Sequence, residues 1–194
     1  MKPTTFLLSS LLTVTSSVVL AEMKQHDSHE HGAAVITVAT NESGLEITLE
    51  SPAANVFGFE YKPTSPADIK TAKQVVEKLE AGSELFSINS TAKCTLNSAD
   101  VDSVVSEDDH ESEDKHDDHD EHKSDDKHDD LKESAHSDVD ATWQFACANP
   151  KAINSLEINL FSAFPKGFEE IDVEWITGSK SGKSELRKDG IIEL

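Results

Sequence analysis

Residues 33–50 read AAVITVATNESGLEITLE. Two runs rich in β-branched residues, 33–40 and 45–50, flank the polar segment NESG, and a glycine at the end of such a segment is typical of a β-hairpin turn. In the second run apolar side chains alternate with polar ones, which predicts a strand with one face in a core and the other in water. We therefore expect the fold to contain an antiparallel pair of strands here.

Further short β-type runs follow toward the C-terminus. They lie at residues 55–61 (as a strand or a bent segment), 85–88, 93–96, 101–105, 142–148, 156–161, 171–177, 184–187 and 191–194, with turns at 165–167 and 178–182. Roughly eight or nine short strands separated by turn residues are typical of a sandwich or barrel-like sheet. The sequence predicts a mainly β fold, a single antiparallel β-sandwich-like domain formed by residues 33–106 and 141–194.

One α-helix is expected at about residues 65–81. Ser65 is a good N-cap, Pro66 suits the first helical position, and Gly82 ends the run. Apolar residues recur at helical spacing and predict a stripe that packs on the sheet: Ile69, Ala72, Val75, Val76 and Leu79.

A strongly polar insert occupies residues 107–140 and reads EDDHESEDKHDDHDEHKSDDKHDDLKESAHSDVD. It contains 17 Asp or Glu, six His and four Lys, and its few apolar residues cannot bury enough surface to offset the entropy of ordering the chain. We expect a long disordered loop. Imidazole and carboxylate groups are ligands of borderline divalent metals such as Zn²⁺, so this loop is a candidate metal-binding segment.

The candidate ligands in the loop are a dense histidine series with interleaved carboxylates and three further histidines within reach along the chain: His116, His119, His122, Asp117, Asp118, Asp120, Glu121, His110, His128 and His136. We expect several ligand sets to compete for zinc. Copper(II) and nickel are competitors, whereas calcium would leave the histidines unexplained. A plain acidic linker is the alternative, although it needs no histidine.

A second group of histidines, His26, His29 and His31, precedes the first strand in the polar segment 22–32, which we expect to be flexible without metal. His29 and His31 would point the same way if the strand begins early, and together they could then hold one ion. An ordinary flexible N-terminus is the alternative. Glu60 is a further candidate ligand within the folded part.

The two cysteines, Cys94 and Cys147, stand on either side of the loop. In an exported protein an even pair is most simply a disulfide, which we expect to tie the two roots of the loop together. The alternative is that both thiolates are metal ligands, although neither lies in a CxxC motif.

The N-terminus has the pattern of a secretory signal peptide. An apolar run at residues 6–20 is followed by Ala21, so the signal would be residues 1–21 and the mature chain would start at Glu22. We expect a soluble periplasmic protein without membrane insertion. The formal net charge of −21 repels nucleic acid and attracts cations.

The segments HGAAVITVA, LEITLESPAANVFGFEYKP, FACANP and LEINLFSAFP, together with the strand at Cys94, resemble the ZrgA-type family of zinc-regulated periplasmic zinc-binding proteins. The resemblance implies an accessory role in zinc acquisition under scarcity, and it aligns His29 and His31 with the family's N-terminal histidine pair. Where relatives often read Gly-Phe-Glu-His, this chain has Gly58-Phe59-Glu60-Tyr61.

The histidines and carboxylates predict a protein that captures Zn²⁺. The resemblance implies that it assists zinc acquisition by an ABC importer, whose solute-binding protein is the expected partner. The chain has no nucleophile elbow, phosphate loop or HExxH motif, so we do not expect an enzyme. One alternative is a metal-stress protein that sequesters copper, nickel or zinc or acts as a chaperone, and another is a metal-dependent enzyme. The importer's own receptor needs two lobes, for which this chain is too short.

Overall fold

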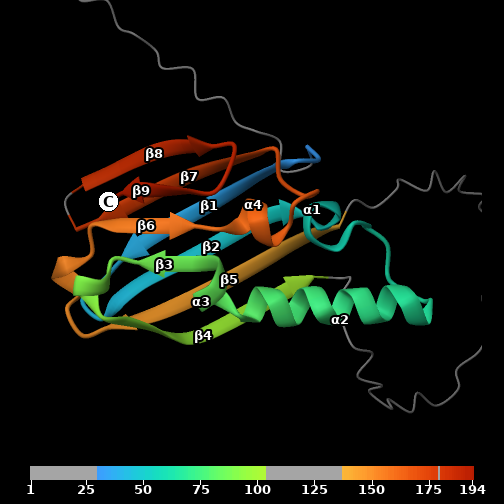
Figure 1. Ribbon diagram of the computed structural model, residues 1–194, viewed down its shortest axis with the longest axis horizontal. Helices are drawn as coiled ribbons and strands as arrows, with labels where there is room; N and C mark the ends of the chain where they lie inside the picture. Colours follow the sequence, from blue (N-terminus) through green and yellow to red (C-terminus); the bar gives the residue numbers. More distant parts are fainter. Residues whose placement is uncertain (1–29, 104–136, 179) are drawn as a thin grey trace, which may run out of the picture.

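The computed structural model describes residues 30–103, 137–178 and 180–194. In these ranges the chain forms two β-sheets and several helices (Figure 1). The larger sheet has the strand order β4 (Cys94–Ser103), β5 (Asp138–Cys147), β2 (Gly44–Pro52), β1 (Ala33–Thr40), β7 (Glu170–Thr177) and β8 (Lys180–Leu186). The smaller sheet has the order β3 (Phe86–Ile88), β6 (Ser155–Ile158) and β9 (Gly190–Glu193). The helices are α1 (Ala53–Phe57), α2 (Pro66–Glu80), α3 (Gly82–Leu85) and α4 (Leu160–Ala163), with 3-10 turns η1 (Ser90–Ala92) and η2 (Pro150–Ala152).

The expected hairpin at residues 33–50 is confirmed. β1 and β2 are antiparallel neighbours, and Thr40 pairs with Leu45 next to the turn. The side chain of Asn41 accepts the backbone N–H groups of Ser43 (2.8 Å) and Gly44 (3.0 Å), which closes the turn. A Cβ on Gly44 would lie 1.8 Å from the carbonyl oxygen of Phe145 on β5, so only glycine fits there.

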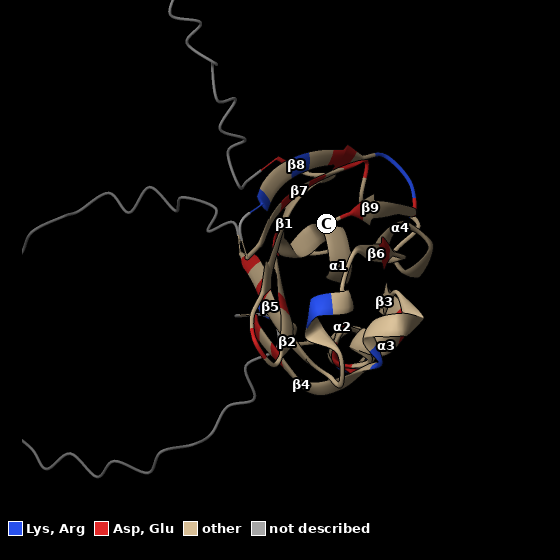
Figure 2. Ribbon diagram, turned by 90° about the vertical axis from the view of Figure 1, so that its left-hand side faces the viewer, with Lys and Arg blue, Asp and Glu red and all other residues tan. Residues whose placement is uncertain are grey.

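The hydrophobic core lies between the two sheets. Figure 2 shows β1, β2 and β5 on one side and β3, β6 and β9 on the other. The inward-facing residues of the large sheet, such as Ile36, Ile47 and Trp143, are fully buried. Trp143 is the largest of them, and its ring makes an edge contact with Phe86 at 4.8 Å between centroids. Acidic residues that alternate with buried ones along β2 and β5, such as Glu50 and Asp140, are exposed.

The expected long helix is confirmed as α2. Its N-cap is Ser65, whose hydroxyl accepts the N–H of Asp68 at 3.1 Å, and Pro66 is the first helical residue. At the other end Trp143 Nε1 donates to the carbonyl of Leu79 at 2.7 Å, which joins the helix to the core. The predicted stripe is buried at Ala72 and Leu79, but Ile69 near the N-terminus is 39% exposed.

The mainly β prediction is confirmed, with one departure from an antiparallel arrangement. β1 and β7 are parallel, from the pair Ala33 and Glu170 to the pair Ala39 and Ile176, so the larger sheet is mixed. A parallel pair needs a long connection, and nothing in the local pattern of either strand reveals it.

Several element boundaries differ from the expected ones for identifiable reasons. Residues 53–57 form the helical turn α1 rather than a strand, and Gly58 ends it with φ of +81°. β4 is one strand in which the run at 101–103 extends the strand expected at 93–96, and an irregularity between Leu96 and Ser98 interrupts its alternation. Residues 160–163 form α4, whose first amides donate to the side chain of Asp189.

One strand at the C-terminal end differs from expectation and one agrees with it. β8 begins at Lys180 inside the expected turn, because Gly182 leaves room for the ring of Trp175 on β7. The strand expected at residues 191–194 is confirmed as β9, which pairs with β6 at the edge of the smaller sheet.

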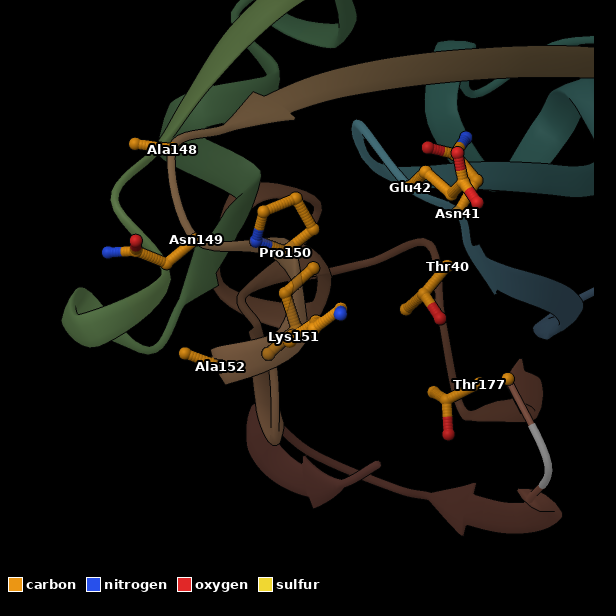
Figure 3. Close-up of a pocket in the computed structure, with 11 residues that line it drawn as sticks. Thr40, Asn41, Glu42, Ala148, Asn149, Pro150, Lys151, Ala152 and Thr177 are labelled. Atoms are coloured by element: carbon orange, nitrogen blue, oxygen red, sulfur yellow. The ribbon is translucent and has the colours of Figure 1, made fainter.

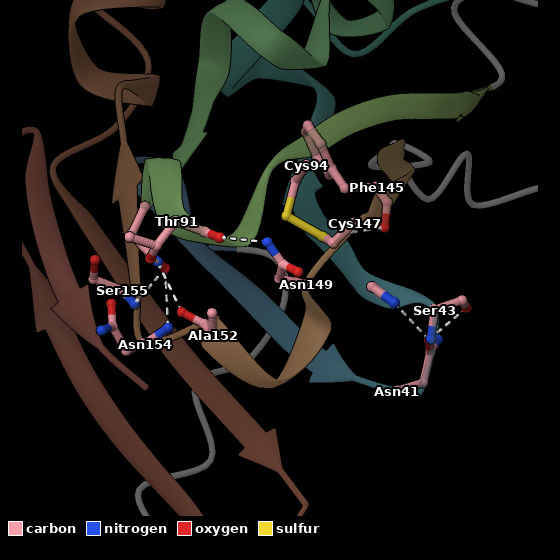
Figure 4. Close-up of a disulfide and its surroundings, with 12 residues drawn as sticks. Asn41, Ser43, Thr91, Cys94, Phe145, Cys147, Asn149, Ala152, Asn154 and Ser155 are labelled. Carbon is pink, nitrogen blue, oxygen red and sulfur yellow. Dashed lines mark hydrogen bonds between the residues drawn. A yellow bond between two sulfur atoms is a disulfide. The ribbon is translucent and has the colours of Figure 1, made fainter.

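The disulfide between Cys94 and Cys147 is present, but it lies at the end of β4 and β5 away from the insert (Figure 4). The two cysteines face each other in the ladder, whereas the insert leaves and re-enters next to the pair Ser103 and Val139 at the opposite end. Backbone pairing, rather than the disulfide, therefore holds the two roots of the insert together. Residues 138–140, expected at the end of the loop, are the first residues of β5.

Candidate metal site

His31 lies in a tight turn immediately before β1. Ala33 N–H donates to Glu30 O at 3.0 Å, and Gly32 adopts a φ of +87° that an L residue with a side chain rarely takes. The carbonyl of Gly32 accepts the N–H groups of Glu169 (2.7 Å) and Glu170 (3.0 Å). The backbone beside His31 is thus bound on the side of β7, which restricts where its imidazole can lie.

Glu60 reaches the same end of the large sheet from the segment after α1. Gly58 turns the chain out of the helix, and the carbonyl of Glu60 accepts the hydroxyl of Ser137 at 2.7 Å. Ser137 is buried and its own carbonyl accepts the N–H of Ala53 at 2.8 Å. The start of α1, the Glu60 segment and the chain that enters β5 are therefore bound together.

The side chains of His31 and Glu60 meet at this point. His31 Nε2 lies 2.7 Å from Glu60 Oε1, with the histidine side chain 61% exposed and the glutamate side chain 17% exposed. An imidazole nitrogen and a carboxylate oxygen are both zinc ligands, and they lie close enough for one ion to replace the proton between them. The pair offers two of the four ligands of a tetrahedral site and remains accessible from solvent.

A second cluster of possible ligands lies on the outer face of β7 and β8. Glu170, Asp172 and Glu185 form the one group of three His, Cys, Asp or Glu side chains in the described ranges whose ligand atoms lie within 4.8 Å of one another. It contains oxygen ligands alone, which suit calcium or magnesium better than zinc.

Two cations already pair with the three carboxylates of this cluster. Lys183 Nζ lies 3.2 Å from Asp172 and Arg187 Nε lies 2.9 Å from Glu185, while Arg187 also contacts Glu170. The hydrogen bond to Asp172 is the main cause of a raised pKa at Lys183. The cluster is therefore an ion-pair network, and the mixed pair His31 and Glu60 is the better zinc candidate.

Of the predicted ligands, the structure brings together His31 and Glu60. The other predicted ligands lie outside the described residues: His26, His29, His110, His116, His119, His122, His128, His136, Asp117, Asp118, Asp120 and Glu121. Two of these positions adjoin the site along the chain, since His29 precedes His31 by two residues and His136 directly precedes Ser137.

Tyr61, the residue that follows Glu60, provides no nitrogen ligand. Its ring stacks on Phe59 at 4.9 Å between centroids, and its hydroxyl lies 3.4 Å from Asp68 of α2. The side chain is 57% exposed. In this chain position 61 therefore packs against neighbouring residues.

Sequence reasoning missed two residues that support the pair, Asn55 and Ser137. Asn55 binds Gly32 and Ala33, and Ser137 binds Glu60. Their partners lie 22 to 77 residues away along the chain. No local periodicity or spacing marks such contacts, so only the fold reveals them.

One pocket lies at the disulfide end of the domain (Figure 3). Its volume is about 1130 Å³, and it lies among the β1–β2 turn, the β5–β6 connection and the end of β7, with Thr40, Asn41, Lys151 and Thr177 in its wall. It contains no histidine or cysteine, so it does not suit zinc.

Comparison with known protein families matches residues 28–191 to the ZrgA family, described as a family of zinc uptake proteins. The matched range runs from just before β1 to the second residue of β9 and spans the polar insert. A search of curated proteins gave no match. No helix in the described ranges is long and apolar enough to cross a bilayer.

Proposed function

The chain belongs to the ZrgA family of zinc uptake proteins, and we propose that it captures Zn²⁺ in the periplasm and passes the ion to an ABC importer. The His31–Glu60 pair carries this proposal, because a nitrogen and an oxygen ligand from segments 29 residues apart lie within 2.7 Å. The rigid domain supplies a defined first contact for one ion.

The polar insert would act as a collector beside this pair. Its six histidines and many carboxylates offer several weak zinc sites, and the formal net charge of −21 concentrates cations near the protein. Because the insert re-enters the domain at Ser137, which binds Glu60, ions released by the insert would be released close to the pair. The protein would act as a carrier by mass action and not as an enzyme.

Zinc binding by the purified mature chain tests the proposal. We expect calorimetry with a competing chelator to find more than one zinc ion per chain. His31→Gln and Glu60→Gln should each weaken the tightest site at least about tenfold, because each removes one protein ligand. Glu169→Gln is the matched control, since this glutamate lies beside Gly32 but is not one of the two proposed ligands. Equal zinc affinity in the wild type and the three variants would show that the tightest site lies elsewhere in the chain.

Passage of zinc to an importer requires a second experiment. The zinc-loaded protein is mixed with the metal-free solute-binding protein of an ABC zinc importer, and the rate of transfer is followed. Transfer by contact should become faster as the receiving protein is made more concentrated, whereas release into solution sets a fixed rate. A transfer rate that does not depend on the concentration of the receiving protein would favour a sequestration role. A cell that lacks this protein and grows poorly in copper excess, but normally in zinc scarcity, would favour the same role.

A further inference from the structure

Asn55 connects the two segments that bear His31 and Glu60. The residue is buried, with only 5% of its surface exposed. Oδ1 accepts the N–H of Gly32 at 2.8 Å, and Nδ2 donates to the carbonyl of Ala33 at 2.9 Å and to Ser51 Oγ at 3.0 Å. Gly32 directly follows His31, while Asn55 belongs to α1, which leads to Glu60. The amide therefore joins one ligand segment to the other.

The partners of this amide explain its effect on His31. Asn55 pairs with the N–H of Gly32 and the C=O of Ala33, and so adds to the hydrogen bonds through which Glu30, Glu169 and Glu170 hold the backbone of residues 32 and 33. The side chain of His31 is 61% exposed. The direction of its imidazole therefore depends on this backbone together with the contact to Glu60.

We propose that Asn55 is a positioning residue for zinc at the His31–Glu60 pair, an inference that rests on the proposed function. Asn55 does not contact the ion. It holds the turn at Gly32 against α1, so that His31 Nε2 stays beside Glu60 before zinc arrives. Groups that orient metal ligands typically change metal affinity by about 10- to 100-fold when they are removed.

Asn89 provides a matched control. Its side chain also bridges backbone groups: Oδ1 accepts the N–H of Asn154 (2.9 Å) and Ser155 (3.3 Å), and Nδ2 donates to the carbonyl of Ala152 (2.8 Å). These contacts lie at the disulfide end of the domain, where Figure 4 shows Ala152, Asn154 and Ser155. Asn89→Ala therefore removes side-chain hydrogen bonds of the same kind far from His31, whereas Asn55→Ala removes them beside His31.

The test measures zinc at His31 alone, in the full mature chain. Imidazole resonances are recorded by NMR while a metal buffer sets the free zinc concentration, and His31→Gln identifies the His31 signals. We expect Asn55→Ala to raise the free zinc needed to shift these signals by about tenfold or more. Asn89→Ala should change this free zinc concentration by no more than about twofold relative to the wild type, even if both variants unfold at lower denaturant concentrations.

A second variant and an internal reporter guard against misfolding. The indole N–H of Trp143 donates to Leu79 in the core, so its resonance shows whether the domain is intact. Asn55→Asp keeps an acceptor for Gly32 but loses the donor to Ala33, and it should also weaken zinc binding at His31. If Asn55→Ala and Asn55→Asp are folded and bind zinc at His31 with unchanged affinity, Asn55 has no positioning role, although the zinc site at the His31–Glu60 pair remains valid. If the His31 resonances of the wild-type protein do not shift when zinc is added, both the proposed zinc site and the positioning role of Asn55 are wrong.

Discussion

Gly32 and Gly58 both have a positive φ, but their surroundings differ. Their φ angles are +87° and +81°, which side chains disfavour. A Cβ on Gly32 would lie 2.9 Å from Glu169 Cγ, whereas a Cβ on Gly58 would meet nothing within 4 Å. The two glycines also flank the site, one next to His31 and the other two residues before Glu60. They can therefore separate backbone strain from steric contact.

We predict that Gly32→Ala destabilises the domain more than Gly58→Ala. Gly58→Ala should cost about 1 kcal/mol through backbone strain alone, and Gly32→Ala about 1 kcal/mol more because Glu169 must move. Urea unfolding of the two variants measures the difference. The same cost in both would show that the Glu169 side chain moves freely, and a smaller cost at Gly32 would contradict the description of its turn.

Asp140 lies in a row of carboxylates on the outer face of the large sheet. It stands opposite Asp102 on β4 and opposite Glu50 on β2. Partial desolvation, followed by the negative charges of Asp102 and Asp138, raises the pKa of Asp140 above its usual value. The folded state therefore binds a proton at Asp140 more readily than the unfolded chain does. This favours the folded state at low pH, and the benefit is lost as the pH rises through the raised pKa.

We predict that Asp140→Asn stabilises the domain at pH 7, because it removes an ionised group that the fold disfavours. The gain should be about 0.5 kcal/mol or less, since the side chain is exposed to solvent. It should disappear below about pH 4, where the unfolded chain is also protonated. Asp100→Asn is the control, because Asp100 stands opposite Thr142 and has no carboxylate partner in that pair. Urea unfolding across the pH range measures both, and a gain that grows toward low pH would contradict the assignment.

The β4–β5 pair carries the disulfide at one end and the polar insert at the other. Cys94 and Cys147 close one end, and the pair Ser103 and Val139 closes the other, next to the insert. The disulfide therefore contributes to the stability of the whole domain, whereas backbone pairing holds the ends of the insert. The His31–Glu60 pair lies at the end held by backbone pairing.

We predict that the double variant Cys94→Ala and Cys147→Ala folds but loses stability without losing zinc at His31. With a sequence separation of 53 between the cysteines, the chain-entropy relation gives a loss of about 4 kcal/mol. Denaturant unfolding measures this loss, and the response of His31 resonances to buffered zinc measures the site. Reduction of the wild-type protein is an independent control. Zinc affinity at His31 that falls with the bond would show that the disulfide also organises the opposite end.

The elements that could be predicted from the sequence are those whose signals are local. The hairpin at β1 and β2 has its turn residues and alternation within 18 residues, and α2 has its cap at Ser65. The parallel pairing of β1 with β7 and the capping of α4 by Asp189 depend on distant partners, and neither leaves a local pattern. The same distinction holds for the site. The side-chain chemistry of His31 and Glu60 predicts that each can bind a metal ion, but only the fold shows that the two side chains are in contact and that Asn55 supports them.

The molecule combines a stable β domain with a polar insert that carries most of its histidines. All nine histidines precede Gly32 or lie within the insert, while the described ranges contain His31 alone. The domain places its single described histidine at the end of the sheet where the insert begins and ends. The two parts therefore meet at one place, and removing the insert should separate their contributions to zinc binding.

We predict that deleting residues 107–136 leaves a folded domain with one zinc site. Residues 104–106 and 137–138 would then connect Ser103 to Val139 as a hairpin loop, and the shorter loop should raise stability by up to about 2 kcal/mol. Calorimetry should find that most zinc ions are lost and that adding His31→Gln removes the last one. Deleting residues 107–140 is the contrast, because it also removes fully buried Val139 and the start of β5, and should destabilise the sheet. If the shorter deletion unfolds the domain, the insert supports the fold, and if it keeps every zinc ion, the collector lies elsewhere in the chain.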